Sequence, residues 1–169
     1  GFRAAHLYAC ARFTLDVWEK YLGRRVDWHF SRHFERLELV AIGPWNNAHM
    51  GYGFLEAGQR QLPDGGVADL ALDFDVIGHE VGHAMMMAFA GPPSPARFTG
   101  DYEALHEAAA DCASMVAALH LTPVVEGLLE ETCGDLHTAN RLTRFAEFSP
   151  TRQIRLANNP LTLWDFVVG

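Results

Sequence analysis

The sequence is poor in cysteine and lysine, and each shortage limits what the chain can be. Its three cysteines, Cys10, Cys112 and Cys133, form no CxxC pair, so a cysteine-based zinc site is not expected. A Cys10–Cys133 disulfide is left open, and we expect Cys112 to be a small buried residue. Lys20 is the only lysine, and the net charge of −8 argues against a nucleic-acid partner.

Long hydrophobic runs are also absent. No stretch approaches the apolar length that a membrane span needs, so no membrane partner is expected. No signal peptide is recognisable at the start, and the composition does not specify an oligomeric state. Of the 169 residues, 49% are hydrophobic, which is enough for a sizeable core in one compact domain or in one large lobe and part of another.

The most informative segment is Asp75-Val-Ile-Gly-His79-Glu80-Val-Gly-His83, which matches the HExxH pattern. The surrounding residues predict a helix, on which two histidines four residues apart leave the same face one turn apart. Two neutral imidazoles placed in this way can bind one Zn²⁺, with Glu80 beside the metal. HExxH also occurs by chance, in helices with two surface or hydrogen-bonded histidines. The apolar surroundings argue against chance, because buried imidazoles and a buried carboxylate need partners.

A third zinc ligand must come from elsewhere in the chain. The longer form of the motif is absent, because Met86 and Phe89 stand where its glycine and third histidine would be. Downstream, Glu103, Glu107 and Asp111 recur every four residues in a second expected helix. One alternative is a solvated acidic stripe, which we prefer for Glu103 because acids favour first turns. For the other two, apolar neighbours favour Glu107 as ligand and Asp111 as acceptor of a histidine N–H.

These segments together resemble the thermolysin-like zinc metallopeptidases, the gluzincin type with HExxH and a downstream glutamate. The substrate-binding edge strand of the family resembles this chain's segment Asn46-Asn47-Ala48-His49-Met50-Gly51-Tyr52-Gly53. This resemblance implies that the Asn47 side chain and the Ala48 carbonyl hold an extended peptide. Ile154-Arg155-Leu-Ala-Asn-Asn-Pro160 resembles the segment whose arginine binds the substrate carbonyl. The resemblance covers roughly residues 1–160, and it favours a secreted protein.

The chain also departs from the family pattern. No histidine follows Arg155, although the family places an oxyanion-stabilising histidine after its arginine. Phe98 stands where the family has an assisting tyrosine, with Tyr102 close by. Ala118 occupies the position of an expected calcium-binding acid, so calcium is not predicted. The chain is therefore expected to be a short or truncated member.

We expect a zinc-dependent peptidase, an endopeptidase with one catalytic zinc. The metal lowers the pKa of a water molecule, Glu80 takes its proton as general base, and zinc and Arg155 stabilise the oxyanion. The substrate pairs as an extended strand along residues 47–52. The alternative is a zinc-bound, non-catalytic or weakly active peptidase-like module that binds extended peptides. The sequence does not specify which peptides would be bound or cleaved.

The expected fold class is α+β, with strands before most of the helices. We expect an N-terminal lobe with the sheet and the zinc helix (1–90) and a helical lobe with the third ligand (91–169). The cleft lies between these lobes, which can count as one domain. The individual elements are expected as helices at 4–21, 123–131, 136–148 and 160–169, strands at 26–30, 37–42, 48–55 and 67–72, and loops at 57–66 and 91–100.

Three further histidines and two helix ends complete the expectations. His29 and His33 are expected at the surface, because their spacing does not converge in a strand. His49 either lines the cleft or is an ordinary strand residue, and the second is preferred. We expect Asp73 or Asp75 to cap the zinc helix, and Gly91-Pro92-Pro93 to end it.

Overall fold

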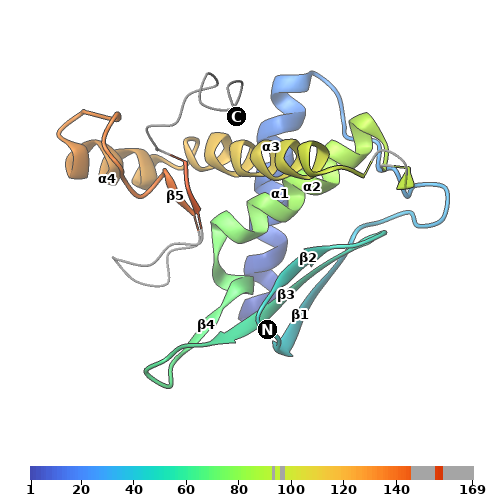
Figure 1. Ribbon diagram of the computed structural model, residues 1–169, viewed down its shortest axis with the longest axis horizontal. Helices are drawn as coiled ribbons and strands as arrows, with labels where there is room; N and C mark the ends of the chain where they lie inside the picture. Colours follow the sequence, from blue (N-terminus) through green and yellow to red (C-terminus); the bar gives the residue numbers. More distant parts are fainter. Residues whose placement is uncertain (93, 96–97, 146–154, 158–169) are drawn as a thin grey trace.

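The computed structural model describes residues 1–92, 94–95, 98–145 and 155–157, and its fold is α+β, as predicted (Figure 1). The helices are α1 (Phe2–Leu22), α2 (Phe74–Ala90), α3 (Gly100–Ala118) and α4 (Thr122–Thr132), with a 3-10 turn, η1 (Leu70–Leu72). The strands are β1 (Glu38–Pro44), β2 (Ala48–Met50), β3 (Phe54–Gln61), β4 (Val67–Asp69), β5 (Arg144–Phe145) and β6 (Arg155–Leu156).

The first four strands form a mixed sheet around β3. Strand β1 pairs with β3 in parallel, whereas β2 and β4 pair with it antiparallel. The single strand expected at 48–55 is wrong, because a turn with Gly53 at a φ of 93° separates β2 from β3. The loop expected at 57–66 is wrong in its first half, which belongs to β3. Among the described strands, β2 has β3 as its one neighbour, so the expected edge strand is confirmed there.

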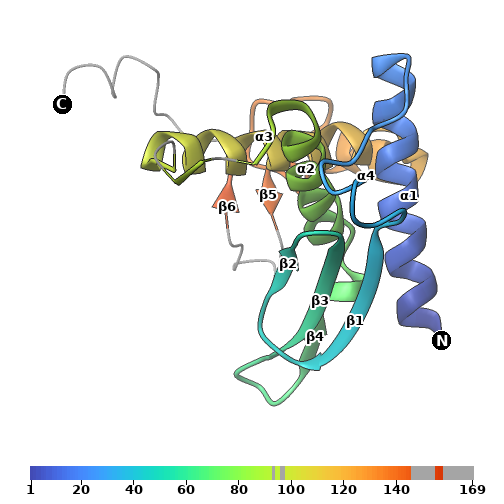
Figure 2. The ribbon, with the colours of Figure 1, turned by 90° about the vertical axis from the view of Figure 1, so that its right-hand side faces the viewer.

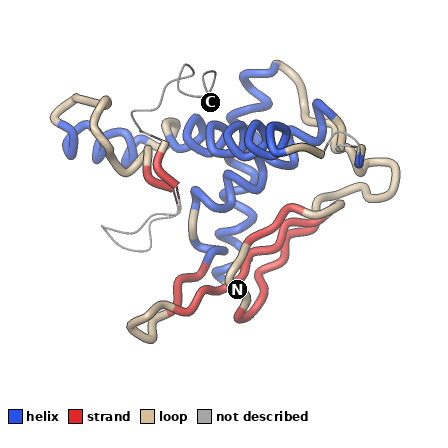
Figure 3. Tube along the Cα trace, in the orientation of Figure 1, coloured by secondary structure: helices blue, strands red, loops and turns tan. Residues whose placement is uncertain are grey.

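The helices pack on one face of this sheet and cover its apolar residues. In Figure 3 the strands of this sheet lie in the lower part of the view, with α2 and α3 above them. In Figure 2, α1 runs beside β1. The core combines side chains of α1, the sheet, η1, α2 and α3: Leu7, Ala11, Leu15, Met50, Leu55, Ala57, Leu70, Ile77, Val81, Ala84 and Ala113. The Trp18 indole also donates a hydrogen bond to the Ala113 carbonyl, at 3.0 Å, which ties α1 to α3.

The strand expected at 26–30 is wrong, because residues 25–28 have no regular structure and residues 29–33 form turns. The Ser31 amide donates to the Trp28 carbonyl at 3.0 Å, and the Phe34 amide to the Phe30 carbonyl at 3.1 Å. These local bonds take the place of a ladder to a neighbouring strand. The rings of Trp28 and Phe30 stack with centroids 5.5 Å apart, and Phe30 is fully buried.

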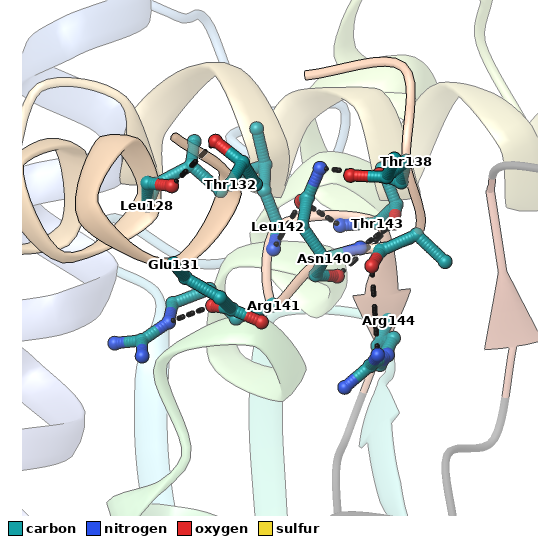
Figure 4. A network of polar contacts seen from close by, with 10 residues as sticks. Leu128, Glu131, Thr132, Thr138, Asn140, Arg141, Leu142, Thr143 and Arg144 are labelled. Atoms are coloured by element: carbon teal, nitrogen blue, oxygen red, sulfur yellow. Dashed lines mark hydrogen bonds and ion pairs between the residues drawn. The ribbon is translucent and has the colours of Figure 1, made fainter. Parts of the chain in front are cut away.

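The helix expected at 136–148 is also wrong over its described part, residues 136–145. Asn140 is buried there, and its side-chain oxygen accepts the amides of Leu142 and Thr143 at 3.0 and 3.2 Å. Its amide nitrogen donates to the Thr138 carbonyl at 2.8 Å (Figure 4). An asparagine that satisfies nearby backbone groups favours turns over a helix. The helix expected at 160–169 lies outside the described residues.

No single described helix is both long and apolar enough to cross a membrane. The pair α3 and α4, bent by 97° at the break between them, meets that test by length and composition only.

Candidate metal centre

The HExxH segment lies in α2, whose two ends are fixed by local chemistry. Of the two expected caps, Asp73 makes the hydrogen bonds: its carboxylate accepts the amides of Asp75 and Val76 at 3.0 and 3.2 Å. The helix ends before Gly91, as expected, where φ is 74°.

Small residues bring α3 unusually close to α2, which it crosses in Figure 1. A Cβ atom added at Gly82 would lie 2.7 Å from the Cα of Ala110, and one added at Gly78 would lie 2.6 Å from the Ser114 hydroxyl. That hydroxyl donates to the Asp75 carbonyl at 3.1 Å and links the two helices. Because each glycine directly precedes one motif histidine, this contact sets how far those histidines lie from α3.

The three predicted ligands come together at this helix contact. The Nε2 atom of His79 lies 3.3 Å from one carboxylate oxygen of Glu107, and the Nε2 atom of His83 lies 3.3 Å from the other. One potential ligand atom from each residue lies within 4.8 Å of the others, so the group could hold a metal ion. The His79 side chain is 9% exposed and that of Glu107 is 47% exposed. The expectation that Glu107 is surrounded by the apolar residues of α3 is therefore wrong.

The other ring nitrogen of each histidine has a hydrogen-bond partner. The Nδ1 atom of His79 lies 2.7 Å from a carboxylate oxygen of Asp111, whose side chain is 16% exposed. A carboxylate can only accept, so Nδ1 carries the hydrogen, and the lone pair of neutral His79 lies at Nε2. That lone pair faces the Glu107 carboxylate, an arrangement that a cation between them would stabilise. The chemistry of these donors therefore fits a metal ion.

The corresponding partner of His83 is His106, which the sequence analysis missed. Their Nδ1 atoms lie 2.7 Å apart, so one donates and the other accepts. If His83 keeps the lone pair on Nε2 for a metal, its Nδ1–H donates, and the hydrogen of neutral His106 lies on Nε2. Burial lowers the pKa of His106, while the nearby Glu107 charge opposes this shift. The sequence feature that could have indicated a role for His106 is its position next to the predicted ligand Glu107, about 100° around the same helix.

A cleft of about 950 Å³ opens over these residues. Glu80 lines it together with His79, His83, His106 and Glu107. Glu80 is 7% exposed, so its side chain is largely shielded from bulk solvent. The cleft is therefore large enough for a small molecule or a peptide segment.

The opposite wall of the cleft is the free edge of β2. The Gly58 amide donates to the Asn47 carbonyl at 3.0 Å, and the Gly51 amide to the Phe54 carbonyl at 2.8 Å. Hydrogen-bonded and non-hydrogen-bonded pairs alternate along an antiparallel ladder. Ala48 and Met50 fall at the non-hydrogen-bonded pairs, so their backbone N–H and C=O groups point away from β3. Both residues line the cleft, which gives this wall a row of backbone donors and acceptors.

Three of the other residues singled out in the sequence also line the cleft. Asn47 and His49 line the cleft beside Ala48, so the preferred interpretation of His49 as an ordinary strand residue is wrong. His29 lines it too and is not simply at the surface, whereas His33 is exposed, as expected. Arg155 lies in β6, where the structure describes its backbone alone, so its predicted role stays a prediction.

The cysteines answer one question that the sequence left open and contradict one expectation. All three are free, so no Cys10–Cys133 disulfide is formed. Cys112 is exposed on α3, contrary to the expectation that it is buried, because α3 packs on α2 through its opposite face. Cys10 is buried, and burial raises the pKa of its thiol to about 11.

The chain matches no family model, no curated protein and no solved structure. The function must therefore be argued from the residues of the cleft.

Proposed function

We propose that the chain is a zinc-dependent peptidase of the thermolysin-like type, an endopeptidase that hydrolyses peptide bonds. The observation that carries this proposal is the convergence of His79, His83 and Glu107 with Glu80 in one cleft. The facing wall is an open strand edge, which is the surface that an extended peptide needs.

Zinc fits this ligand set better than calcium or magnesium. Two imidazole nitrogens and one carboxylate are typical zinc ligands, whereas calcium and magnesium prefer oxygen. Donors about 2.0–2.2 Å from a tetrahedral zinc ion lie roughly 3.3–3.6 Å apart. The Nε2 atoms of His79 and His83 lie 3.3 Å from different oxygens of the Glu107 carboxylate, so each of these contacts has the spacing of two donors on one zinc ion. Three protein ligands are typical of catalytic zinc sites, and structural sites usually have four.

Zinc in this position supplies Lewis acidity, which polarises a carbonyl and lowers the pKa of water. The protein contributes the proton transfers. Glu80 accepts the proton of the attacking water and returns it to the leaving amine. Asp111 and His106 hold the two ligand imidazoles in the tautomer that directs Nε2 into the site.

The edge of β2 holds the substrate as an added strand. The outward N–H and C=O groups of Ala48 and Met50 pair with the peptide backbone, and the Asn47 side chain holds a further backbone group. Backbone pairing is independent of the side chains of the peptide, so this wall fixes its path and not its sequence. Arg155 is the residue we propose for the substrate carbonyl.

The test combines metal analysis with hydrolysis of a mixed peptide library by the zinc-loaded protein. We expect one zinc per chain in the wild type and in Glu80→Gln, which does not change a ligand. We expect kcat/KM to fall by about 10²–10⁴-fold in Glu80→Gln, the usual contribution of a general base. The matched control is Glu126→Gln, an exposed carboxylate on α4 that does not line the cleft, which should leave activity unchanged.

Each other outcome contradicts a defined part of the proposal. Equal activity of the wild type and Glu80→Gln would exclude Glu80 as the base. One bound zinc without hydrolysis of any peptide would favour the alternative, a metal-bound module that binds extended peptides. Freshly purified protein that binds no zinc would contradict both.

A further inference from the structure

The two ends of the cleft differ in chemistry. Along α2, the lining residues run from Asp75 and Val76, through the metal group, to Met87. At the first end, the wall also includes Arg60 and Asn46, next to the start of β2. That end is therefore mixed and charged.

The other end, from His83 towards Met87, is lined mainly by rings: those of His29, Tyr52, Phe98, Tyr102 and His106. The rings of His29 and Tyr52 meet edge to face at 5.3 Å, and those of Tyr102 and His106 lie 5.4 Å apart.

Side-chain contacts place these two ring pairs at the same end of α2. The Arg24 guanidinium lies 5.0 Å over the Phe89 ring, so the segment after α1 that carries His29 reaches the C-terminal end of α2. His106 contacts His83, and Tyr102 lies one turn earlier on α3, so it also lies toward that end. We call this part of the cleft, with its five rings and Met87, the aromatic end.

The aromatic end holds unpartnered polar atoms. In the part of the chain that the structure describes, five buried side-chain nitrogen or oxygen atoms have no hydrogen-bond partner. Three of them belong to the aromatic end: Nδ1 of His29, the hydroxyl of Tyr102 and Nε2 of His106. His106 is only 8% exposed. Such atoms are costly to leave unpaired, and their concentration at one end of a cleft points to a ligand that pairs them.

We propose that the aromatic end is the subsite for a tyrosine side chain of the peptide substrate. This inference rests on the proposed peptidase function and names the substrate class of that site. Flat rings on several sides favour an aromatic ring, through edge-to-face and stacked contacts. A phenol hydroxyl both donates and accepts, so it can pair an imidazole nitrogen and the Tyr102 hydroxyl, whereas a phenyl ring can pair neither.

Charge argues against acidic side chains at this end. Glu103 and Glu107 line the cleft on this side, and the described lining has no lysine or arginine there, since Arg60 lies at the opposite end. Burial also lowers the pKa of His29, which keeps that imidazole neutral at neutral pH. The occupant is therefore polar at its tip but not acidic.

The wall can open to admit a ring. The unpartnered atoms are shielded from bulk water, so a ligand must insert between the rings to reach them. Phe98 is 58% exposed, and exposed side chains change rotamer within nanoseconds.

The test measures binding rather than turnover. Acetyl-Ala-Ala-Xaa-Ala-Ala-amide peptides, with tyrosine, phenylalanine, leucine or lysine at Xaa, are titrated into zinc-loaded Glu80→Gln protein by calorimetry. We expect the tyrosine peptide to bind about tenfold more tightly than the phenylalanine peptide, the effect of one hydrogen bond. Leucine and lysine should bind more weakly than both. Equal or tighter binding of phenylalanine, or a preference for lysine, would overturn the proposal.

A second variant assigns the preference to this end of the cleft. Tyr102→Phe in the Glu80→Gln background should reduce the preference for tyrosine over phenylalanine to near unity, through weaker binding of the tyrosine peptide. The matched control is Tyr8→Phe, an exposed tyrosine on α1, which should retain the preference. His29→Phe should also lower the preference for tyrosine. This variant tests the same assignment if Tyr102→Phe does not fold. A preference that survives both variants would overturn the assignment.

Failure of this inference can be told apart from failure of the proposed function. A tyrosine preference in binding, with no hydrolysis by the wild type, would retain the subsite and overturn the peptidase. Hydrolysis by the wild type with no tyrosine preference in binding would retain the peptidase and overturn the subsite.

Discussion

The two walls of the cleft are built in different ways. The helical wall, α2 and α3, presents specific side chains whose positions depend on a close helix contact and on hydrogen bonds to Asp111 and His106. The strand wall, β2, presents backbone groups and depends only on its pairing with β3. Chemistry on the helical wall is therefore sensitive to single residues, whereas recognition on the strand wall tolerates most side-chain changes.

The largest effect is expected where the helical wall loses a ligand. Glu107→Ala should lower zinc affinity by more than about 100-fold, because loss of an orienting partner alone costs about 10–100-fold. Competition with a fluorescent zinc chelator measures this change. Glu103→Ala is the control, because it removes a carboxylate one turn earlier that also lines the cleft. Equal losses in the two variants would mean that the acidic face binds metal without a defined site.

The orienting partners should have the next largest effect. Asp111→Ala and His106→Ala should each lower zinc affinity by about 10–100-fold. The loss should be greater for Asp111→Ala, because a charged acceptor makes a stronger hydrogen bond than a neutral one. Asp111→Asn retains an acceptor for His79 and should recover part of the affinity. If neither alanine variant changed the affinity, the tautomer argument for these residues would be wrong.

The helix contact itself can be tested without touching a ligand. Gly82→Ala places a methyl group 2.7 Å from the Ala110 Cα, where the backbone must shift. We expect overpacking to cost about 1–3 kcal/mol, offset by about 0.5–1 kcal/mol from the better helix propensity of alanine. Urea unfolding of the zinc-free protein measures the net loss. Gly100→Ala, with nothing within 4 Å of the added methyl, is the control, and equal midpoints would contradict the close contact.

The strand wall should respond to changes in the peptide backbone. Ala48 and Met50 point their backbone groups into the cleft, so the peptide amides that pair with them lie two residues apart. N-methylation of these amides should weaken binding to zinc-loaded Glu80→Gln by about 2- to 10-fold each. Methylation of the amides between them should have no such effect. Calorimetry on a series of singly methylated peptides would reveal this alternation, and a uniform response would exclude strand pairing.

The smallest effect concerns the reactivity of the Cys10 thiol, which lies in the core behind the two walls. Burial raises the pKa of this thiol to about 11, so below that pH it is mostly the unreactive protonated form. Cys112 and Cys133 are exposed. At pH 8 a disulfide reagent should modify two thiols quickly and Cys10 slowly, with its rate rising as the pH approaches 11. Three equally fast thiols would mean that the walls separate readily.

The sequence was informative where a few residues determine a local structure. The helix at 74–90 follows from its apolar composition, its aspartate cap and the glycine at its end, and the shared face of His79 and His83 follows from helical spacing. Glu107 was predicted as the third ligand because a carboxylate among apolar neighbours needs a partner, and it does lie beside the two histidines. The role of His106 in the site could not be predicted from such local patterns. A histidine beside a ligand gains its role only through the angle at which the two helices cross, and that angle depends on contacts between distant residues.

The errors in the fold have a similar cause. The alternation at 26–30 is that of a strand, yet the rings of Trp28 and Phe30 stack on each other in consecutive turns. The helical pattern at 136–148 gives way, over its described part, to turns around one buried asparagine. In both cases, side-chain contacts over a few residues outweigh the periodicity of the segment.

The glycines before the two histidines have a consequence for engineering. They set the distance between α2 and α3 through the main chain, so that distance does not depend on which side chains bind the metal. The ligand at position 107 is half exposed and could be exchanged for histidine or cysteine without a change of helix spacing. The preference of the site for one metal over another could then be altered while the scaffold stays the same.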